Sequence, residues 1–318
     1  MRLFQIKNIR NGYRIVIALL VVLLFNNNAS AQQDPLYSQY NNGLLTLNPA
    51  YAGSRGMLSA MAITRHQWLS FKGAPQTQAL IIHSPFRYFN MGIGATLMQD
   101  NLGPIKNVGL SGDYSYKIDF PNNRTLALGF KASVNFYNAN LEDLTTIDPN
   151  DPIFQESVNR GFIPNFGLGA LYYSDKFYIG LSVPKMLKNV INRNSVTSES
   201  LSKEDIQYLL MGGYVFDVNR IVKFKPYFTA RAVSNAPLSL DLAGQFVFYD
   251  LLWVGATYRW GSAIGGMVQL QLSPQIRIGY AYDLTTNDLQ SFNSGTHEVL
   301  VSFDFNFGKG KVRSPRYF

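Results

Sequence analysis

The 318-residue chain contains no cysteine, which excludes both a disulfide framework and a lipid anchor carried on a cysteine. Charged residues are also scarce, at 15%, whereas soluble proteins use about 25%. Beyond the N-terminal region no apolar run approaches the ~20 residues that a membrane-spanning helix requires. The sequence therefore argues against a disulfide-stabilised domain, a lipoprotein and a bundle of transmembrane helices.

The first 31 residues have the three parts of a secretory signal peptide. Basic residues precede an apolar stretch, Ile15–Phe25, and small residues follow at Ala29–Ala31. We predict cleavage between Ala31 and Gln32, because an uncleaved anchor, the alternative, would need a longer apolar stretch. Cleavage removes four basic residues and no acidic one, so the formal charge falls from +8 to +4. Such a small charge gives no reason to expect a nucleic-acid partner.

The sequence is rich in aromatic residues (14%) and in glycine (26 residues), and it alternates regularly. In the stretch Pro274–Leu284 every second residue is apolar, and small or charged residues stand between them. Strict period-two alternation indicates a β-strand with two different faces. The non-apolar face carries Gly, Ala, Ser and isolated charges, which suits the crowded, wet interior of a closed barrel. The pattern therefore predicts an all-β, closed antiparallel transmembrane barrel in the outer membrane, with its apolar face toward lipid.

Fourteen such strands can be counted, an even number as in bacterial single-chain barrels. We expect them at residues 57–68, 75–84, 91–100, 107–119, 125–138, 164–174, 177–183, 207–216, 222–234, 239–249, 251–260, 262–272, 276–284 and 297–307. The links after even-numbered strands are short, whereas the long links, 139–163, 185–206 and 285–296, follow odd-numbered strands. Outer-membrane barrels have short periplasmic turns and long outer loops, so both termini are expected in the periplasm.

This reading divides the chain into four parts. Residues 1–31 are the signal peptide, and residues 32–56 form a segment that either runs along the periplasmic rim or plugs the lumen. Residues 57–307 form the barrel, and residues 308–318 form a basic periplasmic tail.

Four segments carry a family resemblance: Leu36–Gly53, Arg65–Leu80, Ile163–Pro184 and Arg277–Phe305. Stretches such as LYSQYNNGLLTLNPAYAG and RHQWLSFKGAPQTQAL resemble the PorP/SprF family of the Bacteroidota, and the resemblance covers essentially the whole mature chain. It implies a non-enzymatic outer-membrane component of the type IX secretion system that assists export or surface attachment of a C-terminally signalled cargo, such as an adhesin. It also implies a link to gliding motility, with periplasmic secretion subunits and the secreted surface protein as partners.

Eight charged residues fall on the face that we expect to line the lumen. They are Lys131, Arg231, Asp241, Arg259, Arg277, Asp283, Glu298 and Asp304. Buried charges need partners, so this mixture of signs favours a network that closes the interior. A selective channel usually lines its constriction with one sign. An outer-membrane channel or hydrophobic-substrate transporter is nevertheless the alternative function.

Four residues of the N-terminal segment are candidate partner-binding residues: Tyr40, Asn48, Pro49 and Tyr51. Tyrosine adds contact area at a low cost in conformational entropy, which suits recognition of periplasmic machinery. The alternative is that the segment only packs the lumen.

Catalysis and metal binding have little support in the sequence. Of the three histidines, His297 is expected at a loop rim, and His66 and His83 as neighbours on the first hairpin, without a triad signature. Two histidines alone are a weak metal site, and the run Asp148–Pro152 lacks the spacing of a calcium loop. We predict no enzymatic activity, no cofactor and no metal, and a protein surrounded by outer-membrane lipid.

Overall fold

The structure is a computed structural model that describes residues 37–86, 90–143, 158–193, 200–203, 205–234 and 236–305. The predicted signal peptide, the run at 148–152 and the basic tail at 308–318 lie outside the described residues.

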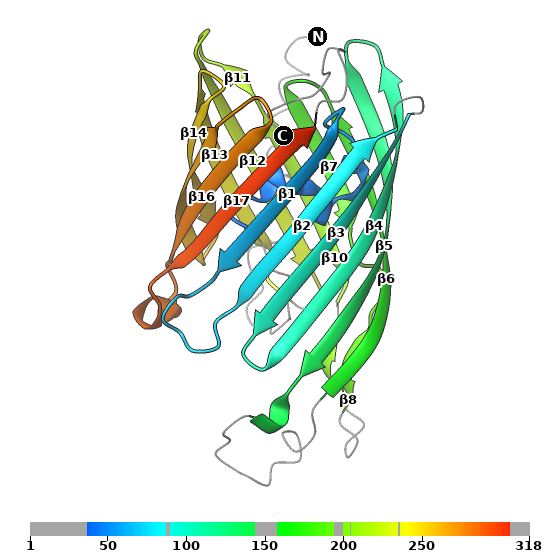
Figure 1. The fold of residues 1–318 in the computed structure, drawn as a ribbon, viewed down its shortest axis with the longest axis vertical. Helices are drawn as coiled ribbons and strands as arrows, with labels where there is room; N and C mark the ends of the chain where they lie inside the picture. The colour runs from blue at the N-terminus through cyan, green and yellow to red at the C-terminus, as the bar shows by residue number, and fades with distance from the viewer. Residues whose placement is uncertain are drawn as a thin grey trace, which may run out of the picture.

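Fourteen antiparallel strands form one closed β-barrel (Figure 1). The first seven are β1 (Leu58–His66), β2 (Gln76–Pro85), β3 (Met91–Leu102), β4 (Ile105–Phe120), β5 (Arg124–Ala139), β6 (Val158–Tyr173) and β7 (Phe177–Val183). The other seven are β10 (Gln207–Tyr214), β12 (Val222–Val233), β13 (Ser239–Phe248), β14 (Leu252–Arg259), β15 (Ala263–Gln271), β16 (Ile276–Thr285) and β17 (Thr296–Phe305). Pairing of β1 with β17 and of β10 with β12 completes the ring. The predicted closed barrel of fourteen strands is confirmed.

Three short strands were not expected from the sequence. In the described part of the long link between β7 and β10, β8 (Val190–Arg193) pairs with β9 (Ser200–Lys203) as a separate hairpin. The two-residue β11 (Phe216–Asp217) continues the pairing with β12 beyond the end of β10. Strand β6 also begins at Val158 instead of residue 164, after a register shift against β5.

The two ends of the barrel carry different links. The links 86–90, 121–123, 174–176, 218–221, 249–251 and 272–275 are short and share one end, the turn end, which is uppermost in Figure 1. The loop end carries the links 140–157, 184–206 and 286–295, the last with η4 (Asp288–Phe292). Asn122, Asn123, Tyr249 and Asp250 have positive φ, as the tight turns of β-hairpins require.

The wall separates apolar from polar residues in the predicted sense. On β16, Ile278 and Tyr280 are 38% and 41% exposed on the outer face, whereas Arg277 and Asp283 are buried in the lumen. On β5, Leu128 is likewise exposed and Lys131 is buried. An apolar outer surface around the barrel is suited to lipid, which cannot hydrate charged groups.

The N-terminal segment Tyr37–Gly56, called the plug below, lies inside the barrel (blue in Figure 1). It forms η1 (Tyr40–Asn42), α2 (Leu44–Leu47) and η2 (Pro49–Tyr51). Asn48 caps η2, because its Oδ1 accepts a hydrogen bond of 2.9 Å from the Ala50 N–H. No helix in the described part of the chain is both long and apolar enough to cross a membrane.

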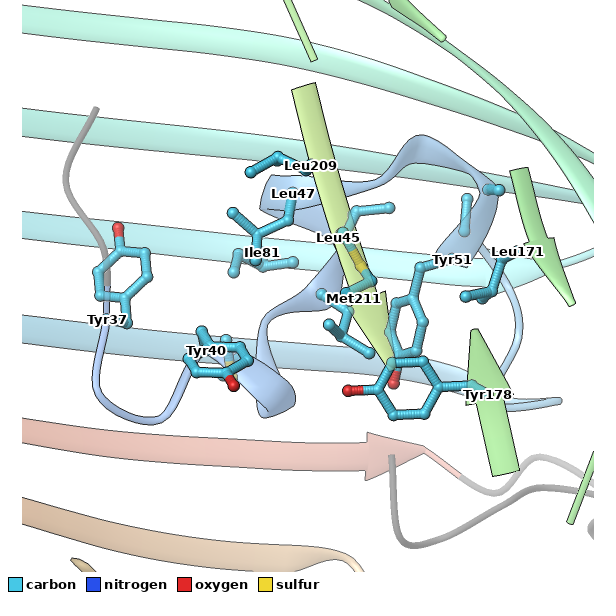
Figure 2. Close-up of a cluster of buried hydrophobic side chains, with 14 of the residues drawn as sticks. Tyr37, Tyr40, Leu45, Leu47, Tyr51, Ile81, Leu171, Tyr178, Leu209 and Met211 are labelled. Atoms are coloured by element: carbon cyan, nitrogen blue, oxygen red, sulfur yellow. The ribbon is translucent and has the colours of Figure 1, made fainter. Parts of the chain in front are cut away.

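The main apolar core lies in the lumen, between the plug and the wall (Figure 2). Leu44 and Leu45 of α2 are buried in one cluster with Met61 of β1 and Ile81 of β2. Burying each such side chain contributes about 1.5–3 kcal/mol. Apolar packing therefore holds the middle of the plug against the wall.

Candidate functional site

A cluster of charged side chains binds the start of the plug near the loop end. The two carboxylate oxygens of Glu298 accept hydrogen bonds of 2.7 and 2.8 Å from the backbone N–H groups of Ser38 and Gln39. Arg65 lies 3.0 Å from a carboxylate oxygen of Asp283 and 3.1 Å from one of Glu298. Arg65 also donates a 2.7 Å hydrogen bond to the Ser38 hydroxyl. We call Arg65, Asp283 and Glu298 the latch.

The middle of the plug docks through Asn48, which is fully buried. Its Nδ2 donates hydrogen bonds to the carbonyl oxygens of Ala170 (3.1 Å) and Leu181 (3.3 Å), on two neighbouring strands. The Ser182 hydroxyl donates a 2.5 Å hydrogen bond to the carbonyl oxygen of Leu47. The plug therefore uses its polar groups as well as its apolar ones to fix its position.

Glycines on the inner face of the wall let the plug approach the strands closely. A Cβ atom added at Gly129 would overlap the backbone nitrogen of Ala50, and one at Gly169 would overlap the Asn48 side chain. The strand glycines at these positions make room for η2 and its cap.

The plug leaves the lumen near the turn end. The Ser115 hydroxyl donates a 2.7 Å hydrogen bond to the carbonyl oxygen of Ala52. The Gly53 N–H donates to Nδ1 of His83 at 3.1 Å. Arg55 then pairs with Asp304 at 3.3 Å, near the last residue of β17. The plug is thus anchored by charged groups at both of its ends.

The loop-end half of the lumen contains a cavity of about 90 Å³ beside the plug. Its lining includes Tyr37, Leu47, Met98, Lys131, Asn135 and Arg231. This volume is far below the about 300–1,000 Å³ of a typical ligand pocket. We call this cavity the vestibule.

A comparison with known protein families shows which family the chain belongs to. A family model described as "Type IX secretion system membrane protein PorP/SprF" matches residues 29–303. The chain belongs to the PorP/SprF family. Membership makes it an outer-membrane component of the type IX secretion system, associated with the membrane and with the secretion machinery. No curated protein sequence matches the chain.

Similar solved structures are outer-membrane proteins. The Acinetobacter baumannii outer membrane protein Omp33 has a TM-score of 0.46 at 10% identity, with 78% of this chain and 98% of that chain covered. A Pseudomonas aeruginosa FadL homologue has a TM-score of 0.44 at 11% identity, covering 79% and 89%. The KdgM porin has a TM-score of 0.40 at 10% identity, covering 78% and 99%. At these identities and TM-scores, the similarity supports no conclusion about what this chain does.

The four candidate partner-binding residues of this PorP/SprF protein all lie in the lumen. Tyr40, Asn48 and Tyr51 are at most 3% exposed, and Pro49 is buried beside them. The Tyr40 ring packs edge-on against Tyr227, with ring centroids 5.3 Å apart. In this structure the segment therefore lies in the lumen and not along a rim.

The eight predicted lumen charges all occur on inward-facing positions of the barrel. Six of them are at most 5% exposed, and Arg259 and Asp304 are partly buried. Lys131 pairs with Asp113 at 2.7 Å and also donates to the Leu45 carbonyl oxygen of the plug at 3.3 Å. Opposite signs thus meet inside the PorP/SprF barrel.

Two further arginines of this set have defined partners. Arg259 pairs with Asp241 at 2.6 Å. Arg277 donates a 2.9 Å hydrogen bond to Gln271 and stacks over the Trp253 ring at 3.9 Å.

The sequence interpretation missed five charged residues that line the lumen or the exit of the plug: Arg55, Arg65, Lys117, Asp113 and Lys225. Lys225 is fully buried, with its amine 5.2 Å from the Trp253 ring centre. The alternation could have found Asp113, which directly opposes Lys131 across the β4–β5 pair. It could also have found Lys117, four residues further along the inner face of β4, whose amine donates a hydrogen bond to the Gly53 carbonyl oxygen of the plug. Arg55 belongs to the plug itself, whose position no periodicity reveals.

The histidine prediction was wrong in one respect. His66 and His83 share the first hairpin but lie at opposite ends of it, since His66 opposes Gln76 and His83 opposes Ser59. His66 instead faces His297 across the β1–β17 pair. His297 accepts or donates a 2.6 Å hydrogen bond with the Tyr280 hydroxyl. In the described residues no three His, Asp or Glu side chains come together as a possible metal site.

Proposed function

We propose that this PorP/SprF protein assists the export or surface attachment of a C-terminally signalled cargo protein, such as an adhesin, without catalysing a reaction. In a gliding bacterium such a cargo would be a motility adhesin. Membership of the PorP/SprF family supports a role in the type IX secretion system. The geometry of the lumen supports a protein that binds other proteins and does not conduct solutes.

The observation that carries this proposal is the anchored plug. Its first residues are bound by the latch, and Arg55 is bound by Asp304 at the other end. A conducting pore or a transporter needs a free path through the lumen and, for selectivity, a constriction dominated by one sign. Here the lumen holds a packed segment and paired charges of both signs, so a passive scaffold for protein contacts fits better.

The four candidate residues take a structural role in this proposal. Tyr40, Asn48, Pro49 and Tyr51 give the plug its shape, and contacts with the periplasmic machinery would fall on the short turns of the turn end. The exported protein would bind on the side of the long loops. Cargo contacts and periplasmic contacts are then separated by the height of the barrel.

The test is deletion of the gene followed by complementation. We expect the deletion to leave a specific large surface protein unexported or shed into the medium, with small-solute uptake unchanged. Complementation with a double variant, Asn48→Ala and Tyr51→Ala, should fail to restore display although the barrel still assembles. Tyr114→Ala, on the exposed outer face of β4, serves as the control and should restore it. Normal display in the deletion strain, together with high ion conductance of the purified barrel, would support the channel alternative.

A further inference from the structure

The outer face of the barrel is not apolar to the same extent on every strand. On β5 the outward residues from Leu126 to Phe136 are all apolar, over a stretch as long as the about 9–11 residues that a membrane-crossing strand needs. On β2 the outward residues between Gln78 and Ser84 are Leu80 and Ile82. The apolar band is therefore narrow on β2, which lies at the front of Figure 1 between β1 and β3.

Gln78 belongs to a row of three uncharged polar side chains on the outer face. It is paired across the sheet with Thr64 of β1 on one side and with Gln99 of β3 on the other. The row ends in apolar residues on both sides, at Val299 of β17 beside Thr64 and at Val108 of β4 beside Gln99. The polar row Thr64, Gln78 and Gln99 is therefore a local patch with apolar neighbours, and the wall as a whole does not become polar along this line.

The polar row lines a hollow of about 400 Å³ in the outer wall. Ala62 of β1 makes the hollow deep, because its methyl group stands between the larger side chains of Leu80 and Val301 on the neighbouring strands. Leu97 of β3 and Val299 of β17 also line it. None of the described residues that line the hollow is charged.

Lipid is a poor cover for such a surface. Acyl chains neither donate nor accept hydrogen bonds, so an amide group among them lacks the partners that water provides. The Gln78 side chain is exposed on the outer face and meets whatever covers the wall. Packing surfaces of membrane-embedded segments combine small residues, which allow close approach, with polar residues that form hydrogen bonds across the contact. The hollow has both features and is suited to another protein surface.

We infer that the hollow is the contact surface between two copies of this chain, related by a two-fold axis along the membrane normal. A glutamine amide both donates and accepts hydrogen bonds, so Gln78 and Gln99 can pair with the same residues of a second copy. Because no charge lines the hollow, two identical surfaces meet there without repulsion. The axis also sets both copies at the same height, so the two polar rows meet at the same depth, which an unrelated partner would have to match.

The first test is cross-linking in the native outer membrane, where a single introduced cysteine is specific because the chain has none of its own. Leu80→Cys places a thiol beside the polar row and keeps both glutamines. Leu242→Cys, exposed on the outer face of β13 on the far side of the ring, is the matched control. A homobifunctional maleimide should convert the Leu80→Cys protein into a cross-linked dimer and leave the Leu242→Cys protein monomeric.

The second test measures the mass of the purified barrel in mild detergent by light scattering, over a dilution series. The double change Gln78→Leu and Gln99→Leu removes both amides and nearly keeps the side-chain size. We expect it to weaken dimer association at least about tenfold, because hydrogen bonds across the contact are lost. Gln275→Leu, at an exposed turn of the turn end, makes the same chemical change away from the hollow and should leave association unchanged.

A monomeric mass of the wild-type barrel, without a cross-linked dimer of Leu80→Cys, would overturn the inference. A cross-link from Leu80→Cys to a different membrane protein would overturn it in favour of a mixed complex, and a lipid retained by a monomeric barrel would show that lipid fills the hollow. Dimers that survive both leucine changes unweakened would also overturn it, because the contact would then not depend on the polar row. Heat-modified mobility on gels verifies that each variant forms the barrel.

Discussion

Gly129 shows how much depends on a single missing methyl group. Changing Gly129→Ala places a Cβ against the backbone of Pro49 and Ala50, which cannot move aside as a flexible side chain could. Overpacking of this kind costs about 1–3 kcal/mol. We expect a corresponding loss in the free energy of unfolding, measured by urea titration of the refolded barrel with tryptophan fluorescence.

Gly112→Ala is the matched control, because Gly112 lies on the neighbouring strand β4 with open space around its added Cβ. It should leave the free energy of unfolding nearly unchanged. An equal effect of both changes would mean that strand propensity, and not contact with the plug, explains the loss.

Inward-facing residues could be predicted from the sequence only where they are polar or small. In β1 and β2 the alternation is less clear, because Met61 and Ile81 point inward although they are apolar. They do so because Leu44 and Leu45 of the plug supply an apolar surface inside the barrel. A rule that assumes a wet lumen fails wherever another part of the chain fills it.

The two faces of a strand should respond very differently to polar substitution. On β5, Leu128→Arg exposes a charge to the lipid and should destabilise the barrel by about 2–4 kcal/mol near the membrane midplane. Ser133→Asn, on the lumen face of the same strand, should cost much less. Urea-unfolding midpoints in phospholipid vesicles measure both. Similar losses would show that the in/out assignment of this strand is wrong.

Strand number and order were accessible from the sequence because period-two alternation recurs along nearly the whole chain. The ends of strands were less accessible, as β6 illustrates. Its extension to Val158 follows a register shift opposite Asn135 and Tyr137, which depends on its partner strand and not on its own residues. Pairing across strands, unlike alternation within one, leaves no signal in a single sequence.

From the latch we derive a prediction about the ion conductance of the whole barrel. In Glu298→Gln, one backbone donor of the plug loses its carboxylate acceptor, and buried Arg65 keeps only Asp283 as a charged partner. We expect this change to cost about 2–5 kcal/mol. We expect the wild-type barrel to be nearly closed in planar bilayers and the variant to open frequently. Asp217→Asn, in a solvent-exposed pair with Lys176, makes the same chemical change and should remain closed. Equal conductance of the two variants would show that the latch does not keep the lumen closed.

The plug itself is the part of the molecule that the sequence could not place. Its helices are only three or four residues long, too short to show a period of 3.6. Its tyrosines and asparagines were compatible with two roles, a partner-binding surface and a segment that packs the lumen. What distinguishes the two is the shape of the lumen, which arises only when all fourteen strands have closed.

The bond between Ser38 and Glu298 joins residues separated by 260 positions. Ser38 precedes all fourteen strands of the barrel along the chain, and Glu298 belongs to β17, the last of them. Bringing such distant residues together costs about 5 kcal/mol of chain entropy, and it cannot begin until β17 has been translated. The same final strand also closes the ring against β1. A chain truncated before β17 would therefore lack both a complete wall and a seated stopper, so a single late strand both closes the wall and fastens what fills it.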